Sequence, residues 1–164
     1  MHTIHDTDLS PAPLLDKYMS QAKAYTPFVD AYHGLVRDLT KGQSLVDFIA
    51  TMTGPTRLRR VVTTGIHAGG ALATVAAPAC LLQWPTANVR CLTFGSPRVG
   101  TRALAQAVQW LTQASYRTVL PADPWPEGVL PAQAGLTHCS QLILLGHQNF
   151  ASDTIRQRLR RCVR

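Results

Sequence analysis

The chain has 164 residues, of which 46% are hydrophobic and 15% charged, so it is suited to one compact domain and is not a disordered chain. Its formal net charge is +7, but the last nine residues hold five arginines and no acid, which leaves +2 for the rest of the chain. These arginines are Arg156, Arg158, Arg160, Arg161 and Arg164.

The basic character therefore belongs to a C-terminal tail and not to a face of the fold. Such a tail suits contact with an anionic partner, which would be nucleic acid, lipid or protein. The alternative is a helix end whose cations complement the helix dipole. The oligomeric state has no signature in the sequence.

No targeting or membrane-spanning pattern is visible. The first eight residues are polar and partly acidic, unlike a secretory signal peptide. The longest stretch without Asp, Glu, Lys or Arg, Val61–Val89, is interrupted by three glycines and two prolines, which argues against a membrane span. The four cysteines form no C-x-x-C pair. Three of them lie in apolar or strand-like surroundings, which favours small buried hydrophobes of an intracellular protein. The four are Cys80, Cys91, Cys139 and Cys162.

Two helices are predicted in the first third of the chain. Apolar residues at helical spacing predict one from Pro11 to about Tyr25, followed by a break at Thr26-Pro27. A second helix is predicted from about Leu35 to Met52, with Gly42 interrupting it.

From there on, predicted strands alternate with predicted helices. The strands are Leu58–Thr64, Val89–Phe94, Tyr116–Leu120 and Leu142–Leu145. The helices are Ala71–Leu82, Thr101–Leu111 and Ser152–Arg161, and a proline-rich loop covers Pro121–Pro131. This alternation predicts an α/β fold with a mainly parallel sheet flanked by helices. Functional sites in such sheets lie beyond the carboxyl ends of the strands.

The turn after the first long strand has the spacing of a nucleophile elbow, in which a central residue stands between two glycines. Gly65 and Gly69 flank His67, and Gly70 follows. This spacing suits a strained turn between a strand and a helix that nearly touch. It predicts that the His67 side chain projects above the sheet and that the backbone amide of Ala68 acts as an oxyanion donor.

Five segments in the same order resemble the class 3 (fungal-type) lipases of the α/β-hydrolase fold. Residues 62–73, V-T-T-G-I-H-A-G-G-A-L-A, resemble the family's elbow, V-T-G-H-S-L-G-G-A-L-A, and residues 93–100 are similar to its T-F-G-S-P-R-V-G. Arg117–Pro126, His33–Leu35 and Gly146–Phe150 resemble the family's R-V-V-x-x-x-D-P-V-P, V-H-x-G-F and D-H-x-x-Y. The resemblance implies a reduced α/β-hydrolase core.

The resemblance also implies roles for single residues. Asp123 falls on the family's triad acid and His147 on its triad histidine, while His138 falls on a histidine outside the triad. The nucleophilic serine falls on His67, which is the main departure from the family pattern. Ser96 lies at the predicted cleft, where a turn role is expected and not a nucleophilic one.

A second departure lies upstream. The family's F-R-G-T type motif, which supplies the other oxyanion donor, has no counterpart in residues 1–30. The sequence therefore predicts an N-terminal helical segment, residues 1–30, without a family match. It is followed by a lipase-like domain, residues 31–164, that ends in an Arg-rich helix. Trp125, beside the triad acid, either lines the cleft or packs against the core.

Three functions compete on these observations. The first is a degenerate or nearly inactive lipase homologue kept for binding or structure, with an acyl ester or lipid as its ligand. The second is an active ester hydrolase that uses His67, or another nucleophile, with His147 and Asp123. The third is an Arg-tailed assembly protein with the fold as scaffold. No cofactor is expected. His67, His147 and Asp123 either hydrogen-bond to one another or hold a divalent metal ion.

Overall fold

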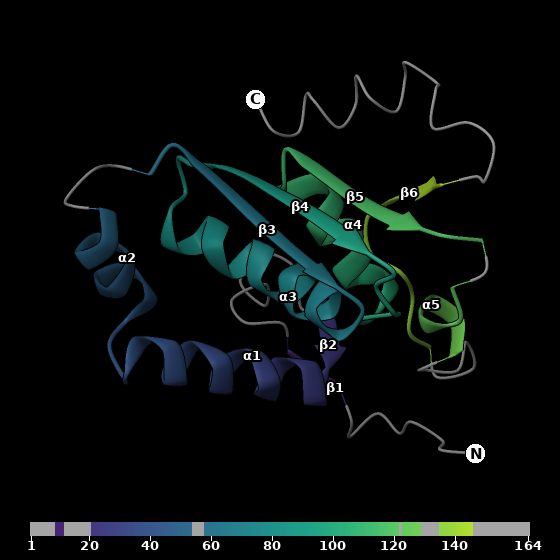
Figure 1. Cartoon of the computed structure of the whole chain (residues 1–164), viewed down its shortest axis with the longest axis horizontal. Helices are drawn as coiled ribbons and strands as arrows, with labels where there is room; N and C mark the ends of the chain where they lie inside the picture. The colour runs from purple at the N-terminus through teal and green to yellow at the C-terminus, as the bar shows by residue number, and fades with distance from the viewer. Residues whose placement is uncertain (1–8, 12–20, 54–57, 122, 129–134, 146–164) are drawn as a thin grey trace.

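The computed structural model describes residues 9–11, 21–53, 58–121, 123–128 and 135–145, and they form six strands and five helices (Figure 1). The strands are β1 (Leu9–Pro11), β2 (Lys23–Tyr25), β3 (Arg60–Ile66), β4 (Asn88–Phe94), β5 (Ala114–Val119) and β6 (Gln141–Leu144). The helices are α1 (Thr26–Thr40), α2 (Leu45–Thr53), α3 (Ala68–Gln83), α4 (Arg102–Leu111) and α5 (Trp125–Gly128).

The main sheet has the order β3-β4-β5-β6, and every neighbouring pair is parallel. The register places Ile66 beside Phe94 and Phe94 beside Thr118, so the carboxyl ends of β3, β4 and β5 lie together at one edge. This arrangement confirms the predicted α/β class, a mainly parallel sheet flanked by helices. Each of the four strands was predicted to within about two residues at either end, because runs of β-branched and apolar residues favour strands. The expectation of buried strands is wrong for β3 and β6, in which only Thr63 and Ile143 are buried.

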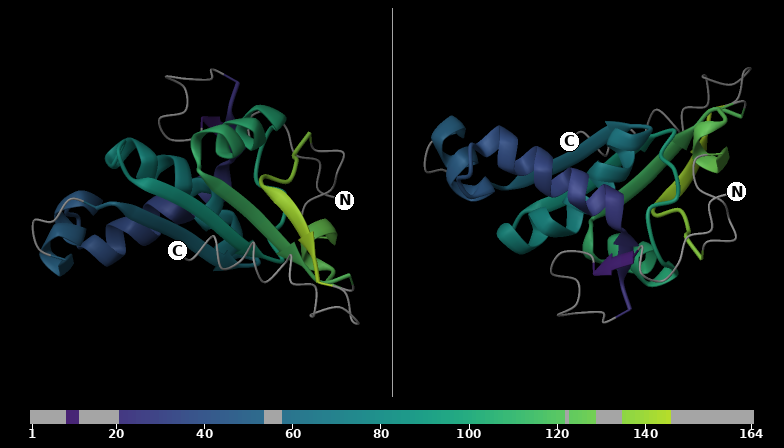
Figure 2. Two further views of the ribbon diagram at one scale, coloured as in Figure 1. Left: turned by 90° about the horizontal axis from the view of Figure 1, so that it is seen from above. Right: turned by 90° about the horizontal axis from the view of Figure 1, so that it is seen from below.

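Helices α1, α3 and α4 build the core on one side of this sheet. α3 packs against β3 and β4, and α1 packs on α3. In Figure 2, α1 lies in front of the strands in the view from below and behind them in the view from above. α3 carries many alanines and glycines, so it approaches the strands closely. Its buried residues Ala71 and Val75 join Val29 of α1 with Leu104 and Val108 of α4 in one apolar cluster. Among the described helices, none has the length and apolar character needed to cross a membrane.

The N-terminal region differs from its prediction. The helix expected from Pro11 to Tyr25 is wrong at its C-terminal end, because Lys23–Tyr25 form strand β2, which pairs antiparallel with β1. Pro27 lies in the first turn of α1, which begins at Thr26. Proline fits there because a backbone N–H in the first turn has no partner within the helix. The sequence predicts only that this proline ends the preceding helix. The part of the expected helix over residues 12–20 lies outside the described residues.

The interruption at Gly42 is confirmed. α1 ends at Thr40, Lys41 and Gly42 both adopt positive φ angles of 51° and 83°, and α2 begins at Leu45. The proline-rich loop contains the short helix α5, which was not predicted. The expected helix Ser152–Arg161 and the Arg-rich tail lie outside the described residues.

Candidate active site at the carboxyl ends of β3, β4 and β5

His67 is the single residue between β3 and α3. Its backbone adopts φ 51° and ψ −119°, a sparsely populated region for a residue with a side chain. Hydrogen bonds hold this conformation: the His67 amide donates to the carbonyl of Phe94 at 2.9 Å, and the His67 carbonyl accepts from the amide of Gly70 at 2.9 Å. The turn is therefore tied to β4 on one side and to the first turn of α3 on the other.

Two of the three glycines around His67 are required by close packing. A Cβ on Gly65 would collide with the backbone carbonyl of Gly69, and one on Gly70 would lie 2.9 Å from the Cβ of Ser96. A Cβ on Gly69 would meet nothing within 4 Å. The close approach of strand and helix expected from the motif thus depends on Gly65 and Gly70. The motif spacing predicts that position 69 also needs a small residue for this close approach, and the open space around it shows that this prediction is wrong.

Asp123 follows β5 and reaches His67. The amide of Asp123 donates to the carbonyl of Leu120 at 3.0 Å, which fixes the turn after the strand. Its Oδ1 accepts from the backbone amide of Trp125 at 3.0 Å, and its Oδ2 lies 3.6 Å from Nε2 of His67. The carboxylate is thus shared between the first residue of α5 and the imidazole. At 3.6 Å, the second contact is an ion pair when the imidazole is protonated, and it is longer than a good hydrogen bond.

Trp125 covers the His67 ring. The two ring centroids are 5.0 Å apart and the rings are inclined by 16°, a stacked arrangement. The side chain of His67 is 40% exposed and that of Asp123 is 13% exposed. The imidazole is therefore in contact with a carboxylate and with an indole while part of it still faces solvent. Of the two alternatives for Trp125, contact with the site is the one observed.

Gly95 makes room for this contact, and sequence reasoning did not single it out as a site residue. It has a φ of 56°, and a Cβ there would collide with Oδ2 of Asp123 and lie 2.7 Å from Cδ2 of His67. Its amide donates to the carbonyl of Thr118 at 2.8 Å. The available signal was its place directly after β4, in the F-G-S-P-R-V-G segment, at the edge where the site forms.

The other predicted site residues are placed as follows. Ala68 is the first residue of α3, beside His67. Ser96 is 1% exposed and its hydroxyl donates to the carbonyl of Pro97 at 3.3 Å, so a substrate in the cleft would not reach it. His138 is half-buried, and its neighbour Thr137 pairs with Gly100. His147 lies outside the described residues, so its role as the triad base stays a prediction.

The described site has an imidazole where the motif places a nucleophile. An imidazole beside a carboxylate accepts and returns a proton, and it can also attack an acyl carbon. Within the described part of the chain, no three His, Cys, Asp or Glu side chains form a group suited to a metal ion. The proposed metal set includes His147 and is not tested by this observation.

Solved structures of fungal lipases share this fold. Lipase II of Rhizopus niveus is 26% identical with a TM-score of 0.65, and the match covers 84% of this chain and 49% of that one. The lipase of Rhizopus microsporus var. chinensis is 26% identical with a TM-score of 0.63, covering 79% and 44%. The triacylglyceride lipase of Rhizomucor miehei has a TM-score of 0.67 at 24% identity, covering 88% and 50%. The chain thus spans about half the length of the lipases it matches.

Among curated proteins, none matches this sequence. The family model described as Lipase (class 3) matches residues 1–132, which is most of the chain and includes the first 30 residues, where no motif was found. The fold, the order of the motifs and this match agree. The chain therefore belongs to the class 3 lipase family and has the α/β-hydrolase fold of that family.

Proposed function

We propose that this protein is a degenerate member of its family, nearly inactive on esters and retained for binding or structure. The observation that carries the proposal is the environment of His67: the residue in the serine position is an imidazole that contacts the acid directly and is stacked on Trp125.

The order of groups in a triad explains why this contact matters. In a serine triad the carboxylate orients the base, and the base takes the proton of the nucleophile. Here the Asp123 carboxylate contacts residue 67 itself, so an imidazole occupies space next to the acid where a separate base would lie. Loss of the triad nucleophile costs about 10⁶-fold in turnover, and loss of one oxyanion donor about 10²- to 10³-fold. Either loss reduces a lipase to traces of activity.

The second candidate is an esterase that uses His67 as its nucleophile. The specific observation in its favour is that the His67 side chain is 40% exposed. In that reaction an imidazole nitrogen attacks the acyl carbon, the alcohol leaves with a proton, and water then hydrolyses the acyl-imidazole. The stacked indole argues against it, because the ring face toward Trp125 is covered.

The test is hydrolysis of p-nitrophenyl butyrate by the protein and by His67→Ala. We expect their rates to agree within about twofold and to show no burst, because a degenerate site leaves only the background that accessible imidazoles contribute. Free imidazole at the same concentration measures that background. A His67-dependent burst, or a rate well above that of His67→Ala, would overturn the proposal and favour the second candidate.

The ligand and the partner of the tail belong to the same proposal. An acyl ester or lipid is the expected ligand, because the fungal lipases that share the fold include a triacylglyceride lipase. The Arg-rich tail is proposed to contact an anionic partner, and the scaffold function would rest on that contact.

A further inference from the structure

One face of the main sheet carries apolar side chains that the described helices leave exposed. Along β4, Val89 and Cys91 are buried against α3, so the alternate residue Phe94 points to the opposite face. The register places Ile66 beside Phe94, and Val62 follows the same alternation along β3. Phe94 is 41% exposed, Val62 47% and Ile66 64%. These side chains define the open face of the sheet, on the side of the strands away from α1 (Figure 2).

Burial on the open face increases from β3 toward β6. Phe94 is beside Thr118, and Thr118 is beside Ile143, so these residues belong to the same face. Thr118 and Ile143 are buried, although β6 is at the edge of the described sheet. Parallel sheets in α/β proteins are covered on both faces. The burial therefore indicates a cover that lies over β5 and β6 and leaves β3 more exposed.

The C-terminal segment of the chain begins beside this face. Leu145 directly follows β6, and its amide donates to the carbonyl of Val119 at 3.0 Å, which fixes the exit of the chain at the carboxyl edge of the sheet. Residues 146–164 follow it. The connection over residues 146–151 can span about 20 Å, whereas β4 lies about 10 Å from β6 because neighbouring strands are about 4.8 Å apart. The predicted helix Ser152–Arg161 can therefore reach β5 and β4.

This predicted helix has one apolar stripe. Ile155, Leu159 and Cys162 are four and three residues apart, so they share one face. A helix with such a stripe buries it against an apolar surface and keeps its polar side in water. The opposite side carries arginines, which are Arg156, Arg160, Arg161 and Arg164.

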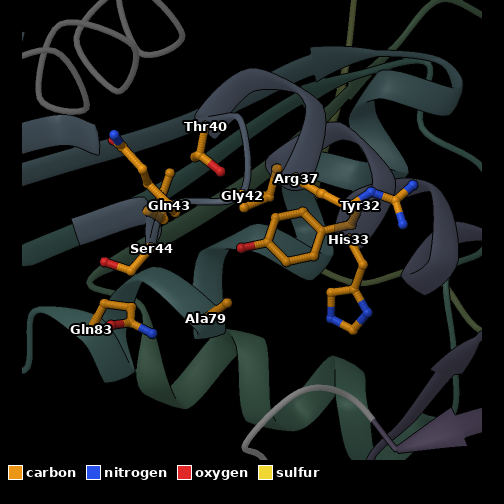
Figure 3. Close-up of a pocket in the computed structure, with 11 residues that line it drawn as sticks. Tyr32, His33, Arg37, Thr40, Gly42, Gln43, Ser44, Ala79 and Gln83 are labelled. Carbon is orange, nitrogen blue, oxygen red and sulfur yellow. The ribbon is translucent and has the colours of Figure 1, made fainter. Parts of the chain in front are cut away.

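The pocket on the helix side of the molecule does not fit this segment. It has a volume of about 390 Å³ and lies between α1, the C-terminal half of α3 and the connection from α1 to α2 (Figure 3). A helix of ten residues is about 15 Å long and about 10 Å wide, which is a volume on the order of 1,000 Å³. The pocket is also lined by polar side chains, among them Arg37, Gln43 and Gln83.

We propose that the C-terminal segment packs as a helix on the open face, over β4 and β5. Its apolar stripe lies against Leu92 and Tyr116, which are half-buried register neighbours on this face. Its arginines then form a basic surface on the outside of the domain, where an anionic partner can reach them. The packing follows from the polarity of the two surfaces and does not depend on ester hydrolysis at His67.

Cross-linking of the full chain locates the segment. Because it leaves β6 at the carboxyl edge, the helix runs back toward the amino ends of the strands, as α3 and α4 do, and brings Cys162 near them. Arg90→Cys and Ala114→Cys place a thiol there, since the two residues are register neighbours on the open face. Oxidation with copper phenanthroline should join Cys162 to at least one of them within the chain, as identified by peptide mass spectrometry. Thr51→Cys, at an exposed position of α2, is the control and should form no such bond.

A second measurement keeps the test decisive if the cysteine variants do not fold. Leu159→Asp puts a charge in the apolar stripe, whereas Gln157→Asp puts the same charge on the opposite side of the helix. Leu159→Asp should lower the urea midpoint and raise the fluorescence of the apolar dye ANS at least about twofold, and Gln157→Asp should match the parent.

Two results would overturn the proposal. The first is the absence of an intrachain disulfide to Cys162 in folded Arg90→Cys and Ala114→Cys, or equal urea midpoints for the two aspartate variants where the cysteine variants do not fold. The second is a disulfide that forms only between two chains, which would assign the open face to a second copy of the protein.

Discussion

Position 67 combines a large side chain with a backbone conformation that side chains rarely adopt. The φ of 51° is maintained by hydrogen bonds to β4 and α3, and the ring is fixed by Asp123 and Trp125. A strained backbone conformation of this kind persists only where contacts with the surrounding structure hold it in place. The turn at His67 therefore has a strained backbone, at the position where the motif predicts one.

The glycines of the site give the first prediction. Gly95→Ala should destabilise the protein by about 2–4 kcal/mol, because the φ of 56° is unfavourable for alanine and the new Cβ collides with Asp123 and His67. Gly69→Ala is the matched control, since its Cβ meets nothing within 4 Å, and it should leave stability unchanged or raise it by up to about 1 kcal/mol. Urea unfolding of both variants measures the difference. Equal stabilities would contradict the packing described for Gly95.

Much of the site was predictable at this scale, for a physical reason. The carboxyl ends of parallel strands meet at one edge, so motifs that follow β3 and β5 had to converge, and His67 and Asp123 are in contact. The stacking of Trp125 was not predictable, because it depends on α5, whose start is fixed by the Asp123 carboxylate. The open space at Gly69 was equally hidden, since a motif gives spacing and not contacts.

At the scale of elements, the strands were predicted better than the N-terminal helices. The strands of the parallel sheet are short runs rich in apolar and β-branched residues, which favour a strand locally. Residues 11–25 have apolar residues at helical spacing, and nothing within that stretch shows that its last three residues pair as a strand. β2 exists because of distant partners: the amide of Tyr25 donates to the carbonyl of Val99 at 2.8 Å, and the amide of Thr101 donates to the carbonyl of Lys23 at 2.9 Å. Local periodicity cannot report contacts more than 70 residues apart in the chain.

Helix α1 gives the second prediction. Gly34 lies inside this helix, and a Cβ there would meet nothing within 4 Å. Gly34→Ala should therefore raise the free energy of unfolding by about 0.5–1 kcal/mol, because alanine loses less backbone entropy in a helix. Urea unfolding provides the measurement. A loss of stability would show that the position is packed or is not helical.

At the scale of the whole molecule, the described cysteines are buried and free, as expected of small core residues. Burial raises the pKa of the thiols of Cys80, Cys91 and Cys139, and that of Cys80 reaches about 11 from its ordinary value of 9.0. These thiols therefore stay protonated in the folded protein at pH values where those of the unfolded chain ionise.

This difference gives the third prediction, a loss of stability at alkaline pH. Between about pH 9 and pH 11 the unfolded chain has released the Cys80 proton and the folded protein retains it, so stability falls as the pH rises. The free energy of unfolding therefore has its full value below about pH 9 and has lost the contribution of the protonated Cys80 thiol near pH 11. The loss is on the order of 2 kcal/mol. Urea unfolding at pH 8.5 and pH 10.5 measures it. Cys80→Ala should have a shallower pH dependence than the parent; an identical slope would contradict this assignment.

The central claim is that residue 67 occupies the nucleophile position of an otherwise recognisable family site, and a single substitution tests it. His67→Ser replaces the ring with a hydroxyl on the same turn, where Gly65 and Gly70 still allow the close approach of strand and helix and Ala68 still begins α3. The predicted base His147 would then take the proton of the serine, oriented by Asp123.

The measurement is the initial rate of p-nitrophenyl butyrate hydrolysis by folded His67→Ser, compared with the parent and with His67→Ser carrying Asp123→Asn or His147→Ala. We predict a rate at least about tenfold above the parent, still far below that of a lipase because the upstream oxyanion donor has no counterpart, and lost in both double variants. A folded His67→Ser protein with no turnover above the parent and the double variants would contradict the claim.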